Sequence, residues 1–171
     1  TVIREYVTIH RYSKEEGWTA IGDETFLMAS CHIAHDCQIG NGVIIINYAG
    51  LSGYVEVEDY AVISGHSGIH PFTRGGKLSY IGGCSKVIQD VPPFVMVDGS
   101  PARARGVNVI GLRRRNVPAE VRQEIQRAFK ILYRSRLSVG HALEKIRAEL
   151  TRSEPLDHFV KFVESSTRGI C

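Results

Sequence analysis

Cysteine is scarce in this sequence, with four in 171 residues, and no two of them form a Cys-x-x-Cys pair. A dense disulfide framework is therefore excluded, and a reducing environment is favoured. Long apolar runs are also missing, since no stretch approaches the roughly 20 residues that a membrane-spanning helix needs. A secretory signal is absent as well. We therefore expect a cytoplasmic protein without a membrane span.

The common nucleotide-binding and hydrolase motifs do not occur either. The sequence has no Gly-x-Ser-x-Gly, no phosphate-binding loop and no dinucleotide fingerprint. The net charge is only +3, but residues 103–136 carry nine Arg and one Lys against two Glu, which is 10 − 2 = +8. Such a basic block attracts phosphates or acidic proteins. Because no recognisable nucleic-acid-binding module accompanies it, we expect no nucleic-acid partner.

What the sequence does have is a period of six residues. Written in sixes from Ala20, the second place is aliphatic nine times in succession: Ile21, Leu27, Ile33, Ile39, Ile45, Leu51, Val57, Ile63 and Ile69. This period suits a parallel β-helix in which each side of a coil takes one hexad and turns one aliphatic side chain inward. The period breaks at residues 12–18, where we predict a looped-out insertion, and at Gly75–Gly76, where we predict a turn or local irregularity. Small residues such as Gly53 and Gly65 suit the tight corners.

The pattern becomes helical after residue 116. Apolar residues then recur at i, i+4, i+8 and i+11 from Val121, and two further short helices are predicted after Ser138 and near Ser153. We predict a β-helix over residues 1–110 and a C-terminal helical cap over residues 111–171. Because the chain opens within the alternating pattern and without an initiator Met, we expect that N-terminal coils precede residue 1.

Histidines in the repeat region are the candidates for chemistry. Residues 18 apart stack on neighbouring coils, so Gly53 is expected one coil from His35, about 4.8 Å away. A backbone N–H beside an imidazole is a plausible oxyanion donor next to a general base. By the same counting, His32, His35 and His70 are predicted to line one cleft. Asp36 is either a corner residue or the group that orients the His35 ring.

Two other interpretations remain open at this point. The segments HIAH and HSGIH offer imidazoles that could bind zinc, which would make the protein a zinc-dependent hydratase of the carbonic-anhydrase kind. Alternatively, the repeats could form a scaffold without catalytic activity.

Six segments together resemble the UDP-N-acetylglucosamine O-acyltransferase family: HIAHDCQIG, SGYVEVEDYAVISG, GIHPF, IGGCSKVIQDVPPF, GVNVIGLRRR and FVESSTRGI. The resemblance spans essentially the whole chain. It implies a left-handed β-helix and a homotrimer with sites between subunits. It also implies transfer of a 3-hydroxyacyl group from the phosphopantetheine of acyl carrier protein to the 3-hydroxyl of UDP-N-acetylglucosamine. That reaction is the first step of lipid A biosynthesis, and it needs no metal or other cofactor.

The resemblance also assigns roles to single residues. It implies that His35 is the general base, Gly53 the oxyanion donor and Asp36 the carboxylate beside the base. Its substrate-binding positions are His32, Tyr54, His70, Gly83, Asn108, Arg114 and Arg115, of which Gly83 sets how deep the acyl tail reaches. The sequence departs from the family where Tyr54, Pro71 and Ile110 replace the usual His, Gln and acidic residue.

Overall fold

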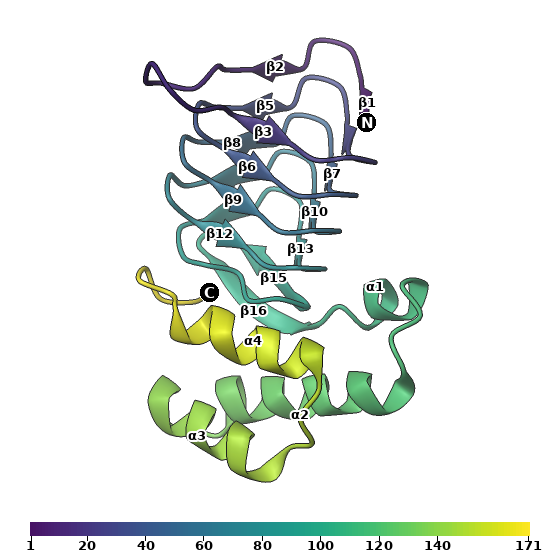
Figure 1. The fold of residues 1–171 in the computed structure, drawn as a ribbon, viewed down its shortest axis with the longest axis vertical. Coiled ribbons are helices and arrows are strands. Elements are labelled where there is room, and N and C mark those ends of the chain that lie inside the picture. The colour runs from purple at the N-terminus through teal and green to yellow at the C-terminus, as the bar shows by residue number, and fades with distance from the viewer.

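The computed structural model describes all of residues 1–171, and most of it is a parallel β-helix of two-residue strands (Figure 1). The first sheet contains β1 (Val2–Ile3), β4 (Phe26–Leu27), β7 (Ile44–Ile45), β10 (Val62–Ile63) and β13 (Tyr80–Ile81). The second contains β2 (Thr8–Ile9), β5 (His32–Ile33), β8 (Gly50–Leu51), β11 (Gly68–Ile69) and β14 (Lys86–Val87). The third contains β3 (Ala20–Ile21), β6 (Gln38–Ile39), β9 (Glu56–Val57) and β12 (Arg74–Gly75). The predicted hexapeptide β-helix with a helical region after it is confirmed.

The register of the strands follows the predicted repeat. Ile45 pairs with Ile63, 18 residues later, and both side chains are almost completely buried. The first coil is longer by six residues, because Thr8 pairs with His32, 24 residues later. The additional residues form the connection between β2 and β3, which contains no strand. The long coil therefore carries its extra residues outside the strand lattice and leaves the column of inward aliphatics unbroken.

Gly75 corrects one prediction. It lies inside β12 and pairs with Val57 of β9, so the coil continues where a turn or irregularity was expected. Residue 75 keeps the inward position of the repeat, but as a glycine it lacks the aliphatic side chain that the other coils place there. The second glycine of the pair has a steric reason, because a β-carbon on Gly76 would lie 2.3 Å from the nitrogen of Pro93. Gly76 leaves the space that the following coil's backbone occupies.

The β-helix ends in a hairpin that the sequence did not predict. Strands β15 (Val95–Gly99) and β16 (Ala102–Val107) are antiparallel, and β15 joins the first sheet by pairing with β13. A short helix that was also missed, α1 (Val109–Arg114), follows directly. Both lie beyond the last aliphatic hexad, where periodic patterning no longer reports on structure.

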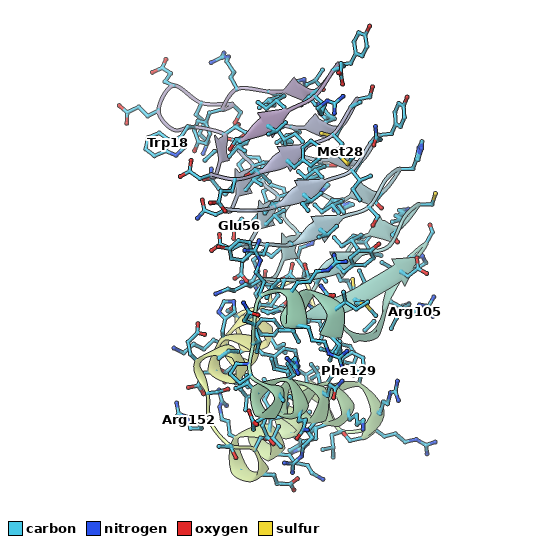
Figure 2. The ribbon with its side chains drawn as sticks, turned by 90° about the vertical axis from the view of Figure 1, so that its right-hand side faces the viewer. Trp18, Met28, Glu56, Arg105, Phe129 and Arg152 are labelled. Atoms are coloured by element: carbon cyan, nitrogen blue, oxygen red, sulfur yellow. The ribbon has the colours of Figure 1, made fainter.

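Three longer helices pack together at this end of the β-helix (Figure 1). They are α2 (Ala119–Arg134), α3 (Val139–Glu149) and α4 (Glu154–Glu164), and they correspond to the three predicted helices. Ser138 and Ser153 cap α3 and α4 by accepting a backbone N–H in the first turn. No helix has the length and apolar character needed to cross a membrane. In Figure 2, Phe129 points into the helical region while Trp18 and Arg152 lie on the outside.

Candidate active site

His35 and Asp36 lie at the corner between the second and third sheets, between β5 and β6. The Asp36 side chain is 1% exposed, and its Oδ2 is hydrogen-bonded to Nδ1 of His35. Burial pushes the pKa of Asp36 up, but hydrogen bonds from His35 and Ser13 outweigh burial and hold that pKa below its ordinary value. A charged carboxylate only accepts hydrogen bonds, so Nδ1 of His35 carries the proton. The other ring nitrogen, Nε2, is then free to accept one.

Gly53 lies directly against the His35 ring, on the next coil. A β-carbon on Gly53 would be 2.5 Å from Cε1 of His35, so only glycine leaves room for the imidazole there. The N–H of Gly53 donates to no group in the chain, whereas that of the following residue, Tyr54, donates to the carbonyl of His35. The corner therefore presents a basic ring nitrogen beside a free amide donor, in the stacking that the 18-residue spacing predicted.

A groove of about 540 Å³ runs from this corner over the outer face of the second sheet. His32 and His70 line it, as predicted, together with Gly53. His35, the third residue predicted for this cleft, is not among the lining residues, but its ring lies against Gly53 at the edge of the groove. Its floor holds two glycines, Gly50 and Gly68, at which a β-carbon would meet nothing within 4 Å. Packing inside the chain does not require glycine at either position, so their effect is to keep the groove open.

His10 also lines the groove and was missed by sequence reasoning. Its ring meets that of His32 edge-on, with centroids 4.6 Å apart, and Thr8 Oγ1 lies 2.7 Å from Nδ1 of His32. Burial and the nearby charge of His10 lower the pKa of His32, which favours a neutral ring at neutral pH. His10 directly follows Ile9, which pairs with Ile33 at a spacing of 24 residues, because the first coil is six residues longer. A count by 18 therefore passes over it.

The loop between β2 and β3 contributes to the site, which the sequence did not indicate. The backbone N–H of Ser13 donates to Asp36 Oδ1 over 3.3 Å, and Ser13 Oγ lies 3.2 Å from the hydroxyl of Tyr54. The Tyr54 ring stacks on Phe72 with centroids 4.6 Å apart and meets His35 edge-on at 5.4 Å. Thr19 Oγ1 accepts the N–H of Asp36 over 2.9 Å. The insertion thus holds the buried carboxylate from outside the repeat.

Four predicted site residues lie elsewhere in the chain. Gly83 is exposed at the corner between the first and second sheets, between β13 and β14. Arg115 stacks on Tyr60 at 3.6 Å, at the corner between the third and first sheets, and Arg114 lies beside it at the end of α1. Asn108 is buried, where it donates to Leu78 O and caps α1. A single chain does not bring these residues to His35.

The structure contains no group of three or more His, Cys, Asp or Glu side chains arranged to hold a metal ion. Nδ1 of His32 contacts the hydroxyl of Thr8, and Nδ1 of His70 contacts the guanidinium of Arg168. Neither contact is with a second metal-ligating side chain.

Known proteins match nearly the whole of this chain. Residues 19–53 match the bacterial transferase hexapeptide repeat, and residues 90–171 match the second domain of UDP-N-acetylglucosamine O-acyltransferase. The acyl-[acyl-carrier-protein]–UDP-N-acetylglucosamine O-acyltransferase of Thermodesulfovibrio yellowstonii is 50% identical over 99% of this chain and 66% of its own length. The solved UDP-N-acetylglucosamine acyltransferase of Campylobacter jejuni is 35% identical, with a TM-score of 0.87 over 98% of this chain and 68% of that one. The chain belongs to the UDP-N-acetylglucosamine O-acyltransferase family.

The family resemblance extends to the arrangement of coils and helices. The crystal structure of the Arabidopsis UDP-N-acetylglucosamine acyltransferase superposes with a TM-score of 0.94 at 37% identity, covering 99% of this chain and 62% of that one. The chain thus spans about two thirds of the length of the acyltransferases that it matches, just under that share of the Thermodesulfovibrio protein. Within the shared part, the acyltransferase fold includes both the β-helix and the helices after it.

Proposed function

We propose that this chain transfers a 3-hydroxyacyl group from acyl carrier protein to the 3-hydroxyl of UDP-N-acetylglucosamine, the first step of lipid A biosynthesis. The observation that carries the proposal is the His35 corner. It combines a ring nitrogen oriented by a buried carboxylate with a free Gly53 amide one coil away, at the edge of an open groove. The names of the relatives support the substrates, and the geometry supports the reaction type.

The proposed reaction is an acyl transfer by general-base catalysis. Nε2 of His35 removes the proton of the sugar 3-hydroxyl while the hydroxyl oxygen bonds to the thioester carbon. The Gly53 N–H donates to the resulting oxyanion, a contribution typically worth about 3 kcal/mol to the barrier. The carbon–sulfur bond then breaks, and the phosphopantetheine sulfur leaves with the proton held on His35. Asp36 keeps the ring in the tautomer that this sequence of steps needs. No metal enters the scheme.

A homotrimer belongs to the same proposal. Gly83 lies at another corner of the coil, and Asn108, Arg114 and Arg115 lie in or beside α1, so they can act on a substrate at His35 only from a neighbouring copy. Arginines in the basic block suit a pyrophosphate and an acidic carrier protein, because guanidinium pairs bidentately with phosphate and carboxylate. The proposal places the reaction in the cytoplasm, where carrier protein and sugar nucleotide occur together.

Mass spectrometry tests the chemistry directly. The parent chain, His35→Ala and a control, His141→Ala, are incubated with UDP-N-acetylglucosamine and 3-hydroxyacyl carrier protein. His141 is exposed at the start of α3, far from the groove. We expect acylated sugar nucleotide from the parent and the control only, unchanged by a chelator. Product from His35→Ala would reject His35 as the base, and no product from the parent would reject the proposed activity for this chain.

Mixed trimers test the shared site. His35→Ala and Arg115→Ala chains, each expected to be inactive alone, are co-expressed with different affinity tags and purified through both tags. Every trimer that carries both tags contains both chains, so one of its three interfaces pairs an intact His35 with an intact Arg115. Recovered activity supports sites between subunits, whereas activity no higher than that of the separate variants contradicts them.

A further inference from the structure

The C-terminal tail brings an arginine to the groove. Nη2 of Arg168 lies 3.1 Å from Nδ1 of His70, although the two residues are 98 positions apart. Arg168 follows α4 and belongs to neither the repeat nor the basic block. His70 lines the groove together with Gly53, so the contact reaches the candidate active site from outside the β-helix.

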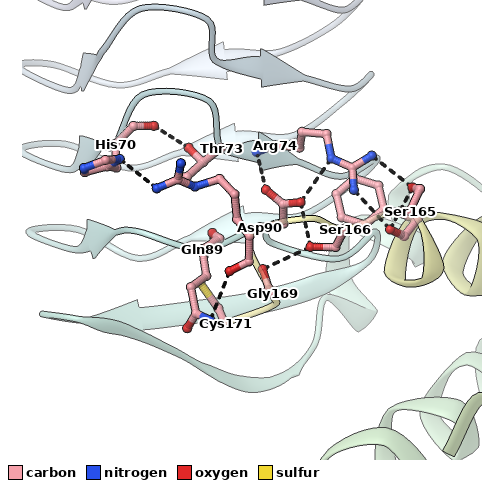
Figure 3. A network of polar contacts seen from close by, with 11 residues as sticks. His70, Thr73, Arg74, Gln89, Asp90, Ser165, Ser166, Gly169 and Cys171 are labelled. Carbon is pink, nitrogen blue, oxygen red and sulfur yellow. Dashed lines mark hydrogen bonds and ion pairs between the residues drawn. The ribbon is translucent and has the colours of Figure 1, made fainter. Parts of the chain in front are cut away.

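A network around a buried carboxylate fixes the path of the tail (Figure 3). The backbone of Asp90 donates to Gly169 O and accepts from Cys171 N, each over 2.9 Å. Its side chain is almost completely buried and accepts hydrogen bonds from Ser166 Oγ at 2.9 Å and from Nε of Arg74 at 3.1 Å. The tail is therefore held on both sides of Arg168, which limits where the guanidinium can lie.

The chemistry of the two partners determines where the proton of His70 resides. An arginine has only donors, so Nδ1 of His70 must be the acceptor in their contact. The same Nδ1 lies 3.2 Å from the carbonyl of Pro71, and a bond to that carbonyl would require a proton on Nδ1. The two contacts exclude each other. With Arg168 in place, Nδ1 is unprotonated and the proton of the neutral ring is on Nε2.

We propose that Arg168 is a positioning residue that fixes the Nε2–H tautomer of His70. The Nε2 atom has no partner in the chain and the side chain is exposed on the groove. His70 then presents a hydrogen-bond donor to an oxygen of the bound substrate, an acceptor of the kind that a sugar nucleotide carries. This role rests on the proposed function for its substrate, but the tautomer itself does not.

Nitrogen NMR of the ¹⁵N-histidine-labelled chain tests the tautomer without any activity. Spectra are recorded at pH 8 for the parent, Arg168→Met and a control, Lys161→Met, with His70 assigned from a His70→Gln sample. Lys161 is an exposed cation on α4 away from the groove. We expect His70 of the parent and the control to show an unprotonated Nδ1 and a protonated Nε2, and Arg168→Met to shift toward the opposite tautomer. A protonated Nδ1 in the parent, or unchanged His70 nitrogen shifts in Arg168→Met, overturns the proposal.

Kinetics test the consequence for the substrate. Loss of the fixed donor removes one hydrogen bond, so the KM for the sugar nucleotide is expected to rise about tenfold in Arg168→Met while kcat stays within about twofold. Arg168→Lys, which keeps a donor, should recover part of that loss. A KM equal to that of the parent contradicts the role in binding. If the parent has no activity, the proposed function fails while the NMR result still decides the tautomer.

Discussion

A β-carbon on Gly53 would lie 2.8 Å from Nε2 of His35, which is closer than real side-chain contacts come. The imidazole therefore occupies the space that any other residue at position 53 would fill. Because this ring is 43% exposed, it can move outward without disturbing the core. The structure thus ties the identity of one corner residue to the placement of the base on the previous coil.

The first prediction is that Gly53→Ala loses activity much more than stability. The methyl group should displace the His35 ring by about an ångström, and a misplacement of that size costs on the order of 10²-fold in kcat. The melting temperature should change little. The control Gly140→Ala, where a β-carbon meets nothing within 4 Å, should keep parent activity and gain slightly in stability because alanine favours helix α3. Steady-state kinetics measures the loss of activity, and thermal unfolding measures the change in melting temperature. Parent-like activity in Gly53→Ala would mean that the stacked geometry does not matter for the reaction.

The second prediction concerns the carboxylate beside the base. In Asp36→Asn the side-chain amide can donate to Nδ1 of His35, which favours a proton on Nε2 and disables the base. We expect kcat to fall by roughly 10²- to 10⁴-fold at neutral pH. Asp36→Glu, which keeps the charge, should lose less. Equal losses in the two variants would show that the charge of Asp36 is not what matters.

The stability of the same variant should depend on pH in a defined direction. The pKa of Asp36 lies below its unfolded value of about 3.9, so the unfolded chain takes up the proton first as the pH falls. The stability that the charged Asp36 provides is thus complete above about pH 5 and is lost as the pH falls below about 4. Urea unfolding of the parent and Asp36→Asn at several pH values measures the difference. A difference that grows as the solution becomes more acidic would contradict this sign.

The third prediction is that Asp90→Ala destabilises the chain strongly. The change leaves the Arg74 guanidinium, whose side chain is 26% exposed, without its carboxylate, and it frees Ser166 of the tail. Breaking a buried pair typically costs about 3–5 kcal/mol in the free energy of unfolding. Asp157→Ala is the control, because its partner Arg152 is 81% exposed and such pairs contribute at most about 1 kcal/mol. Denaturant titrations measure the free energy of unfolding of both variants. Equal losses would show that Asp90 does not stabilise the chain more than an exposed ion pair does.

The fourth prediction tests the position that sets acyl length. Gly83 is exposed, and the nearest atom to a β-carbon there is Gly65 O at 3.4 Å, so Gly83→Met should fold normally. In a trimer its side chain should shorten the space for the acyl tail. Product profiles with carrier proteins of graded 3-hydroxyacyl length are expected to shift to shorter chains. If the parent and Gly83→Met prefer the same acyl length, this assignment for Gly83 is rejected.

Much of the fold could be predicted because every coil repeats one local rule. The aliphatic hexads and the capping serines, Ser138 and Ser153, report on structure within a few residues of themselves. The hairpin of β15 and β16 and the short helix α1 were missed because periodic patterning stops at Pro92–Pro93. Gly75 was misread because the sequence gives the side chain of an inward position, while the backbone of β12 is held by its neighbours.

The site divides in the same way. His35, Gly53 and His70 came from counting in eighteens, which works wherever the lattice is unbroken. The insertion hid His10 by lengthening the first coil, and it gave no signal for the bond from Ser13 to Asp36. Arg168 and its contact with His70 depend on the return of a tail across 98 residues, which no local pattern encodes.

The strict 18-residue register also limits how such a chain can change its length. Deleting one residue between β3 and β14 would turn every later inward side chain out of the core, whereas deleting eighteen would remove one whole coil and leave the remaining columns aligned. Size variation in the repeat is therefore quantised, and a substrate groove on its face can be lengthened or shortened only in steps of about 4.8 Å. The loop between β2 and β3 is the exception, because its six extra residues lie outside the strand lattice and add the contact of Ser13 without shifting any column.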